Sequence, residues 1–148
     1  KEIFNSKIIH CFRNPLDNIL SIYRANFDRG NYYSSSLIDS TKVYLDQERI
    51  ISIYKDQCRQ KIYDLNYDLL VKNPDKEIKS LINWLGWEWN KSYLSPHLNK
   101  RAVYTASDVQ VRSKINPKSI NGWKNYKEML KPAIEILTQD DEYKNLYY

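Results

Sequence analysis

The sequence predicts a helix-rich α/β fold with a parallel sheet, and three observations carry this prediction. Two apolar runs of strand length occur, at residues 7–12 and at residues 61–67. Between them, at about residues 37–59, apolar residues recur with the period of a helix. Parallel strands need a long crossover connection, so a strand, a long helix and a second strand indicate a right-handed βαβ unit.

The first apolar run ends directly before a polar turn. The almost uninterrupted apolar character of this run is typical of a strand buried on both faces. Asn14 and Pro15 then fit the N-cap and the first position of a helix, and Asp17 adds an acidic side chain to its first turn. We expect this helix to run to about Asp28 and to end at Gly30.

Polar residues also follow the second apolar run, beginning with Tyr67 and Asp68. A few residues later, Asn73 and Pro74 predict the start of another helix, and Gly86 predicts its end. Apolar residues at helical spacing between these signals make this the clearest helix in the sequence.

The rest of the chain is less regular. From residue 90 to about residue 119 no helical or strand period is present, and a loop of that length is usually functional or mobile. Order returns with a helix predicted from about Tyr126 to Thr138, and Trp123 before it is expected to anchor the core. The length suits one domain over residues 1–148.

Composition limits the classes of function. Hydrophobic residues make up 42% and charged residues 28% of the chain, as in an ordinary globular protein. No apolar run approaches the roughly 20 residues of a membrane span, so we expect no span. The net charge of +5 favours an anionic partner, but Lys and Arg are dispersed along the chain, which argues against nucleic acid.

The cysteines and histidines are few and far apart. Cys11 and Cys58 lie in apolar patterns and are expected to be buried free thiols, which favours a reducing, cytoplasmic compartment. His10 and His97 add no metal-ligand spacing, so we expect no metal site.

A candidate anion site lies where the first strand ends. Ligands of parallel sheets bind at the carboxyl ends of the strands, and Arg13 stands there. Ser21 follows Asn14 by seven residues, which is about two turns or roughly 10 Å along the same helix face. A guanidinium beside a helix N-terminus suits a phosphate. An ion pair between Arg13 and Asp17, with Ser21 an incidental surface residue, is an equally open reading.

Other candidates have structural alternatives of their own. Tyr67 lies at the end of the second strand and could simply pack in the core. Ser107 and Arg112 lie in the long polar segment and could simply be solvated. With only three glycines, the chain has no glycine-rich phosphate loop.

At residues 7–24, the segment KIIHCFRNPLDNILSIYR resembles part of a known enzyme family. It is similar to the strand and helix that bind the 3′-phosphate in sulfotransferases that use 3′-phosphoadenosine 5′-phosphosulfate (PAPS). In that family an Arg ends the strand and a Ser follows eight positions later. Arg13 and Ser21 match both the residue types and the spacing.

Two later segments resemble the same family in the same order. NYDLLVKNPDKEIKSLINWLGWEW is similar to the segment whose tyrosine contacts the adenine, and Tyr67 stands at that position. TASDVQVRSKINPKSINGWKNYKEMLKP is similar to a segment that closes over the nucleotide, and Ser107 and Arg112 fall on the matching positions. The third match is clearest in bacterial enzymes linked to helical repeats and in tyrosylprotein sulfotransferases.

The resemblance implies a partial P-loop-type parallel sheet with flanking helices, and transfer of a sulfuryl group from PAPS to an acceptor hydroxyl on a protein or a carbohydrate. An upstream helical-repeat domain is a possible partner. The family's phosphosulfate-loop strand and its catalytic base have no counterpart in these residues. We therefore expect the carboxyl-terminal portion of a sulfotransferase-like domain, which supplies the 3′-phosphate and adenine part of the donor site, and we assign no catalytic residue. A non-catalytic nucleotide-binding module and, less favoured, a basic nucleic-acid-binding domain are the alternatives.

Overall fold

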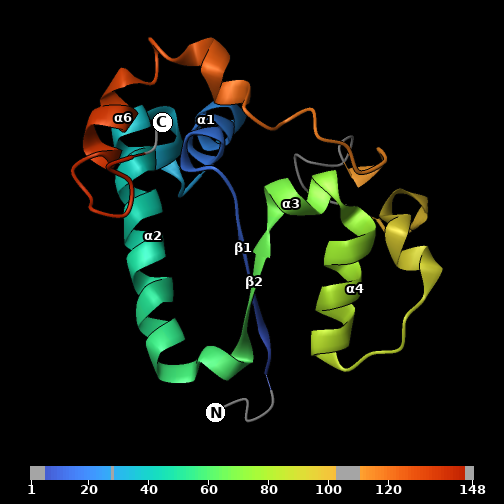
Figure 1. The fold of residues 1–148 in the computed structure, drawn as a ribbon. Coiled ribbons are helices and arrows are strands. Elements are labelled where there is room, and N and C mark those ends of the chain that lie inside the picture. The colour runs from blue at the N-terminus through green and yellow to red at the C-terminus, as the bar shows by residue number, and fades with distance from the viewer. Residues whose placement is uncertain (1–5, 28, 103–110, 146–148) are drawn as a thin grey trace. The chain divides into compact units, whose positions relative to one another are not determined.

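The structure is a computed structural model that describes residues 6–27, 29–102 and 111–145. Its internal contacts divide the chain into two compact units (Figure 1). Unit 1 consists of Lys1–Phe12 and Cys58–Lys118, and unit 2 consists of Arg13–Gln57 and Ser119–Tyr148. The single domain over residues 1–148 stays a prediction.

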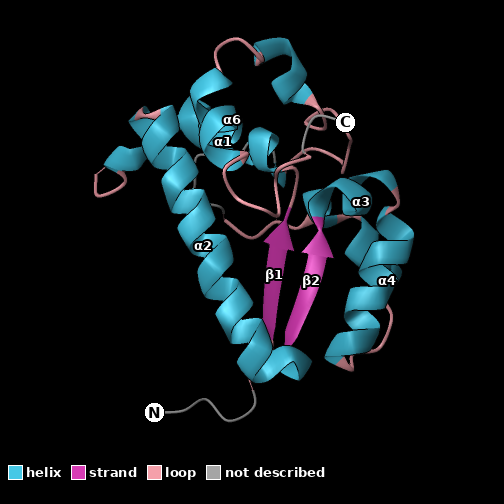
Figure 2. Ribbon diagram, turned by 60° about the vertical axis from the view of Figure 1, so that its left-hand side comes forward, coloured by secondary structure: helices cyan, strands magenta, loops and turns pink. Residues whose placement is uncertain are grey.

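Unit 1 is built on a parallel pair of strands. Strand β1, Ile8–Phe12, pairs with strand β2, Ile62–Asn66, and the register places Ile8 opposite Ile62 and Phe12 opposite Asn66. Figure 2 shows the two strands side by side and pointing the same way. The parallel pairing predicted from the two apolar runs is therefore confirmed.

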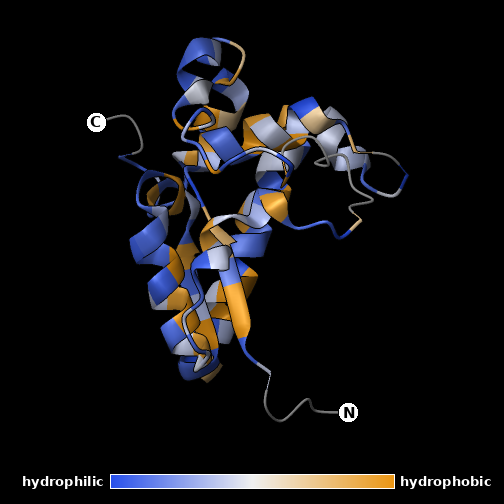
Figure 3. Ribbon diagram, turned by 90° about the vertical axis from the view of Figure 1, so that its right-hand side faces the viewer, coloured by the Kyte–Doolittle hydropathy of each residue, from blue (hydrophilic) through white to orange (hydrophobic). Residues whose placement is uncertain are grey.

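Burial of β1 differs from the prediction. The strand that follows the N-terminal trace is mostly orange, the colour of apolar residues, in Figure 3. Yet Ile8 and Ile9 are 41% and 43% exposed, so the prediction of a strand buried on both faces is wrong. Cys11 is exposed as well, and Cys58 is only partly buried, which corrects the expectation of two buried thiols. An apolar run indicates a strand, but it does not say what covers that strand.

Two helices of unit 1 follow β2 and pack against it. They are α3, Tyr67–Lys72, and α4, Pro74–Leu85. Helix α3 begins where the side chain of Asn66 accepts a hydrogen bond from the backbone N–H of Leu69 at 3.0 Å. Helix α4 begins at its proline and ends at Gly86, whose φ of 75° suits a residue without Cβ, and both ends were predicted.

Among the residues of unit 1 that the structure describes, the buried apolar side chains come from the second strand and the two helices. They are Ile62, Leu65, Val71 and Ile82. After α4 the chain forms two short 3₁₀ turns, Lys91–Leu94 and Pro96–Leu98. The ring of Tyr93 in the first turn lies edge-on to that of Trp89, with 6.1 Å between the ring centroids.

Unit 2 consists of helices around one apolar core. Its main helices are α1, Pro15–Ala25, α2, Leu37–Cys58, and α6, Lys131–Leu137, with 3₁₀ turns at Tyr32–Ser35 and Gly122–Tyr126. The buried core cluster consists of Leu16, Ile19, Leu20, Tyr44, Leu45, Trp123, Leu130, Ala133, Leu137 and Tyr143. Trp123 is therefore a core residue, as predicted.

Two helix ends in unit 2 differ from the prediction. Helix α1 ends at Ala25 because Asn26 adopts the left-handed conformation, with φ 43°, before the predicted stop at Gly30 is reached. Helix α6 begins at Lys131 rather than near Tyr126. Pro132 fits the first turn of a helix but not its interior, so the residues before it form a separate 3₁₀ turn.

Within the described ranges, every helix is too short or too polar to cross a membrane.

Candidate functional site

The first turn of α1 is fixed by its N-cap. The side-chain oxygen of Asn14 accepts hydrogen bonds from the backbone N–H groups of Leu16 and Asp17, at 3.0 and 3.1 Å. Pro15 occupies the first helical position, where its missing N–H costs nothing. As predicted, Arg13 therefore stands between the last residue of β1 and a capped helix N-terminus.

The guanidinium of Arg13 makes contacts within unit 2. Its Nη2 donates to the backbone carbonyl of Ser119 at 2.6 Å and lies 3.7 Å from Oδ2 of Asp17. The ion pair that the sequence left open is therefore present, and the Ser119 carbonyl is a partner that the sequence did not reveal. Nη2 makes both of these contacts, and a guanidinium carries five N–H donors on three nitrogens. An ion pair at one nitrogen therefore does not by itself exclude anion binding by a guanidinium.

Asp17 is the most buried charged group at this site. It is only 3% exposed, and each of its oxygens accepts a backbone hydrogen bond. Oδ2 accepts from Asn121 at 2.7 Å, and Oδ1 accepts from Trp123 at 2.9 Å. The carboxylate thus connects the start of α1 to the segment Ser119–Trp123. Sequence reasoning offered Asp17 only as a first-turn acid or a partner of Arg13, because a partner about 100 residues away leaves no local signal.

Ser21 is exposed on the second turn of α1. It follows Asn14 by seven residues, which is close to two full turns, so both face the same side of the helix, roughly 10 Å apart along its axis. Arg13 and Ser21 thus belong to the same unit and to the same helix and its N-terminal turn. Their spacing in the sequence is retained as a spacing along one helix face.

The other predicted site residues belong to unit 1. Tyr67 is partly buried as the first residue of α3. Arg112 is exposed, and its guanidinium donates to the backbone carbonyl of Arg101 at 2.9 Å and to that of Asn99. Ser107 lies outside the described residues. The described part of the chain contains no group of three or more His, Cys, Asp or Glu side chains that could hold a metal ion.

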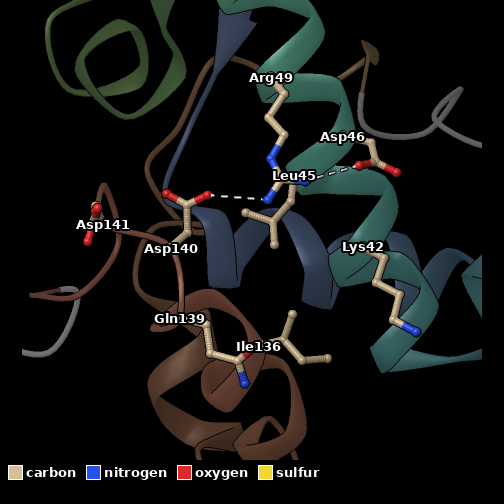
Figure 4. A pocket seen from close by; sticks show the side chains of 8 residues that line it. All are labelled: Lys42, Leu45, Asp46, Arg49, Ile136, Gln139, Asp140 and Asp141. Carbon is tan, nitrogen blue, oxygen red and sulfur yellow. Dashed lines mark ion pairs between the residues drawn. The ribbon is translucent and has the colours of Figure 1, made fainter.

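Each unit also has a surface cavity. In unit 2, a cavity of about 670 Å³ lies between α2 and the residues after α6, and Figure 4 shows Arg49 between the carboxylates of Asp46 and Asp140, at 3.6 and 3.8 Å. In unit 1, a cavity of about 680 Å³ is lined by residues of the two 3₁₀ turns, by Ser95 between them and by Asn99, whose carbonyl accepts a hydrogen bond from Arg112. None of the predicted site residues that the structure describes lines either cavity.

Two buried tyrosines in unit 2 have perturbed acidity. The hydroxyls of Tyr44 and Tyr143 lie 3.4 Å apart within the core. Burial raises the pKa of Tyr143 to about 12, although its hydrogen bond with Tyr44 acts in the opposite direction. Burial, reinforced by Tyr143, raises the pKa of Tyr44 further. Both phenols therefore keep their protons near neutral pH, which makes them core residues rather than general bases.

The sequence model of the Sulfotransferase family matches residues 2–91, more than half of this chain. The chain belongs to the sulfotransferase family. An uncharacterized protein of Aquifex aeolicus (strain VF5) is 32% identical to this sulfotransferase chain over 138 residues, which cover 91% of the chain and 18% of that protein.

A solved structure is similar in fold. The sulfotransferase domain from the Synechococcus PCC 7002 olefin synthase matches with a TM-score of 0.55 and 24% identity, over 80% of this chain and 42% of that one. The helix-rich α/β fold with parallel strands is therefore that of a sulfotransferase neighbour, as predicted. This sulfotransferase chain spans less than half of the length of either protein.

Proposed function

We propose that this sulfotransferase chain binds PAPS and that Arg13 and Ser21 hold its 3′-phosphate. One observation carries the proposal: Arg13 lies directly before the capped N-terminus of α1, and Ser21 lies two turns further on the face of the N-cap. The backbone N–H groups of a helix N-terminus favour an anion, and a planar guanidinium can pair with two phosphate oxygens. A serine hydroxyl can donate to a third oxygen.

The proposed site would hold the end of the donor that does not react. In the proposed reaction, the acceptor hydroxyl oxygen forms a bond to sulfur while the bond from sulfur to the 5′-phosphate oxygen breaks. Adenosine 3′,5′-bisphosphate leaves, and the hydroxyl proton passes to a base. Arg13 and Ser21 form no bond in this step, and their contribution is to place the donor for in-line transfer. They also select for the 3′-phosphate, because a guanidinium left without its anion costs more than a lost apolar contact.

Three more residues are proposed on their motif positions. Tyr67 is proposed to contact the adenine, and Ser107 and Arg112 are proposed to cover the nucleotide. The observed contacts of Arg112 with two backbone carbonyls mean that it would have to reach the nucleotide from this position or exchange one of them. The acceptor is proposed to be a hydroxyl of a protein or a carbohydrate.

Substitution of Arg13 tests the phosphate site. Calorimetry on the full-length protein should show that Arg13→Ala weakens the binding of adenosine 3′,5′-bisphosphate by about 10- to 100-fold, the loss of a charge-assisted hydrogen bond. Ser21→Ala should weaken it by about fivefold, as for a neutral donor. Arg49→Ala is the matched control, since it removes an exposed guanidinium with two carboxylate partners from the same unit. Unchanged affinity in Arg13→Ala would contradict the proposal.

A transfer assay tests the reaction itself. The full-length protein is incubated with PAPS labelled in its sulfuryl group and with separate pools of protein, carbohydrate and small-molecule acceptors. Label in one pool identifies the acceptor class and supports the proposed transfer. Tight binding of adenosine 3′,5′-bisphosphate without transfer to any pool would favour the non-catalytic binding module instead.

A further inference from the structure

The carboxylate of Asp17 is held in a fixed orientation. Each of its two oxygens accepts a backbone N–H, from Asn121 at 2.7 Å and from Trp123 at 2.9 Å. The side chain is almost completely buried and lies in the first turn of a capped helix. Trp123 in turn belongs to the core cluster of unit 2. The position of the carboxylate is therefore set by backbone groups and by the core, not by a mobile side-chain partner.

This fixed carboxylate faces the guanidinium of Arg13. Nη2 lies 3.7 Å from Oδ2 of Asp17 and 2.6 Å from the carbonyl of Ser119. Nη2 thus donates a hydrogen bond to the Ser119 carbonyl and lies within ion-pair distance of the Asp17 carboxylate. Because the guanidinium is planar and rigid, fixing one of its nitrogens also fixes the directions of its other N–H groups. Ser119 stands two residues before Asn121, so the same carboxylate also helps to hold the carbonyl in place.

We propose that Asp17 is a positioning residue that aligns Arg13 for the 3′-phosphate and so sets the preference for 3′-phosphorylated nucleotides. This inference rests on the proposed function of Arg13. Asp17 does not itself touch the nucleotide in this scheme. It acts through the guanidinium, whose orientation is paid for in folding rather than in binding.

The negative charge of Asp17 and its alignment of Arg13 would have opposite effects on the affinity for a phosphate. A carboxylate beside the site repels a phosphate, so removal of its charge would strengthen binding if charge alone mattered. Removal of the alignment would weaken binding instead. Asp17→Asn separates the two effects, because an amide has nearly the same size but turns an NH₂ group toward the N–H donors that the carboxylate now satisfies.

The experiment compares two nucleotides on the full-length protein. Dissociation constants for adenosine 3′,5′-bisphosphate and adenosine 5′-monophosphate are measured by calorimetry, and their ratio isolates the 3′-phosphate. We expect Asp17→Asn to lower this preference about tenfold. Asp46→Asn, the same change at an exposed ion pair of unit 2, should leave it unchanged. A merely structural role would weaken both nucleotides alike, so an unchanged or increased preference in Asp17→Asn overturns the proposal.

Measurements on the wild-type protein distinguish a failure of the Asp17 proposal from a failure of the proposed 3′-phosphate site. If it shows no preference for the 3′-phosphate, the proposed phosphate site fails before any variant is made. If the preference exists, the double variant Arg13→Ala, Asp17→Asn should show no further loss beyond Arg13→Ala, because Asp17 acts through Arg13. Additive losses would contradict the proposal.

A second measurement covers the case in which Asp17→Asn does not fold. The Arg13 side chain of the wild-type protein is observed by ¹⁵N nuclear magnetic resonance. A held guanidinium gives separate Nη signals because its rotation is slow, and this result supports the proposal. A single averaged Nη signal, as for a freely rotating group, overturns it without any substitution.

Discussion

The two units begin their helices in the same way but bury their apolar residues differently. In each unit an asparagine near a strand end caps a helix: Asn14, two residues after β1, caps α1 of unit 2, and Asn66, the last residue of β2, caps α3 of unit 1. Unit 2 then packs α1 into a core in which Leu16, Ile19 and Leu137 are fully buried. Both units leave large apolar side chains at the surface, but among the described residues the apolar side chains that are fully buried all belong to unit 2.

This difference bears on where a fixed binding group can be built. Arg13 stands on the helix that carries the packed core, and its partner Asp17 is tied to Trp123 of the same core. Tyr67 stands on a helix of only six residues. Leu69 of this helix is exposed, and Tyr63 of the preceding strand is partly exposed. A similar local pattern therefore gives a firmly supported side chain in unit 2 and a less supported one in unit 1.

The largest expected effect comes from one substitution made in both units. Leu137→Ala in the core of unit 2 should lower the free energy of unfolding by about 2–5 kcal/mol, since it removes buried methyl groups and leaves a cavity. Leu98→Ala in unit 1, where the side chain is 70% exposed, should change it by less than about 0.5 kcal/mol. Urea denaturation followed by circular dichroism measures both. Equal losses would show that Leu98 is covered in solution and would remove the contrast between the units.

The second largest expected effect is a loss of stability of unit 2 at high pH, caused by its two buried tyrosines. The folded state keeps the proton of Tyr143 up to a pKa of about 12, because burial disfavours the phenolate, whereas the unfolded chain releases it near pH 10. This contribution to stability is therefore fully present below pH 10 and is lost as the pH rises from 10 to 12. The slope is about −1.4 kcal/mol per pH unit for each such group.

Denaturation midpoints between pH 9 and pH 11.5 check this expectation. Tyr143→Phe should make the decline above pH 10 shallower, because the residue that loses its proton on unfolding is gone. Tyr44→Phe should do the same, since burial raises the pKa of Tyr44 as well. A decline of unchanged steepness in both variants would show that the core of unit 2 admits water around these hydroxyls.

The sequence predicted the elements well because their signals are local. The two strands, the long helix α2 and the proline-started helices α1 and α4 all follow from periodicity, caps and breakers within a few residues. Burial was less predictable, because it depends on what covers an element. The apolar positions Ile50 and Tyr54 extend the helical stripe of α2, yet they are 54% and 52% exposed.

The candidate site shows the same division. Arg13, Asn14 and Asp17 lie within five residues, so a helix N-terminus with a guanidinium was visible in the sequence, and so was the possible ion pair. The role of Ser119 and of the backbone at Asn121 was not visible, since these groups lie more than 100 residues away and act through main-chain atoms of no particular residue type. Only the fold brings a carbonyl and two N–H groups to that turn.

The smallest expected effects are the losses of stability when each of three asparagines near helix starts is replaced by alanine. Asn14→Ala removes the acceptor of two backbone N–H groups at α1 and should cost about 1–2 kcal/mol of the free energy of unfolding. Asn66→Ala removes the acceptor of one such group at the short helix α3 and should cost about 0.5–1 kcal/mol.

Asn73→Ala is the matched control for both. Asn73 precedes Pro74 at the start of α4, but its side chain makes no cap hydrogen bond, so the substitution should cost less than about 0.5 kcal/mol. Urea denaturation of the three variants under one set of conditions gives the order. If Asn73→Ala were as costly as Asn14→Ala, the residue type at the cap position would decide stability rather than the hydrogen bonds. The cap hydrogen bonds of Asn14 would then not explain why the turn at Arg13 is held more firmly than the one at Tyr67. Only the buried core of unit 2 would remain as an explanation.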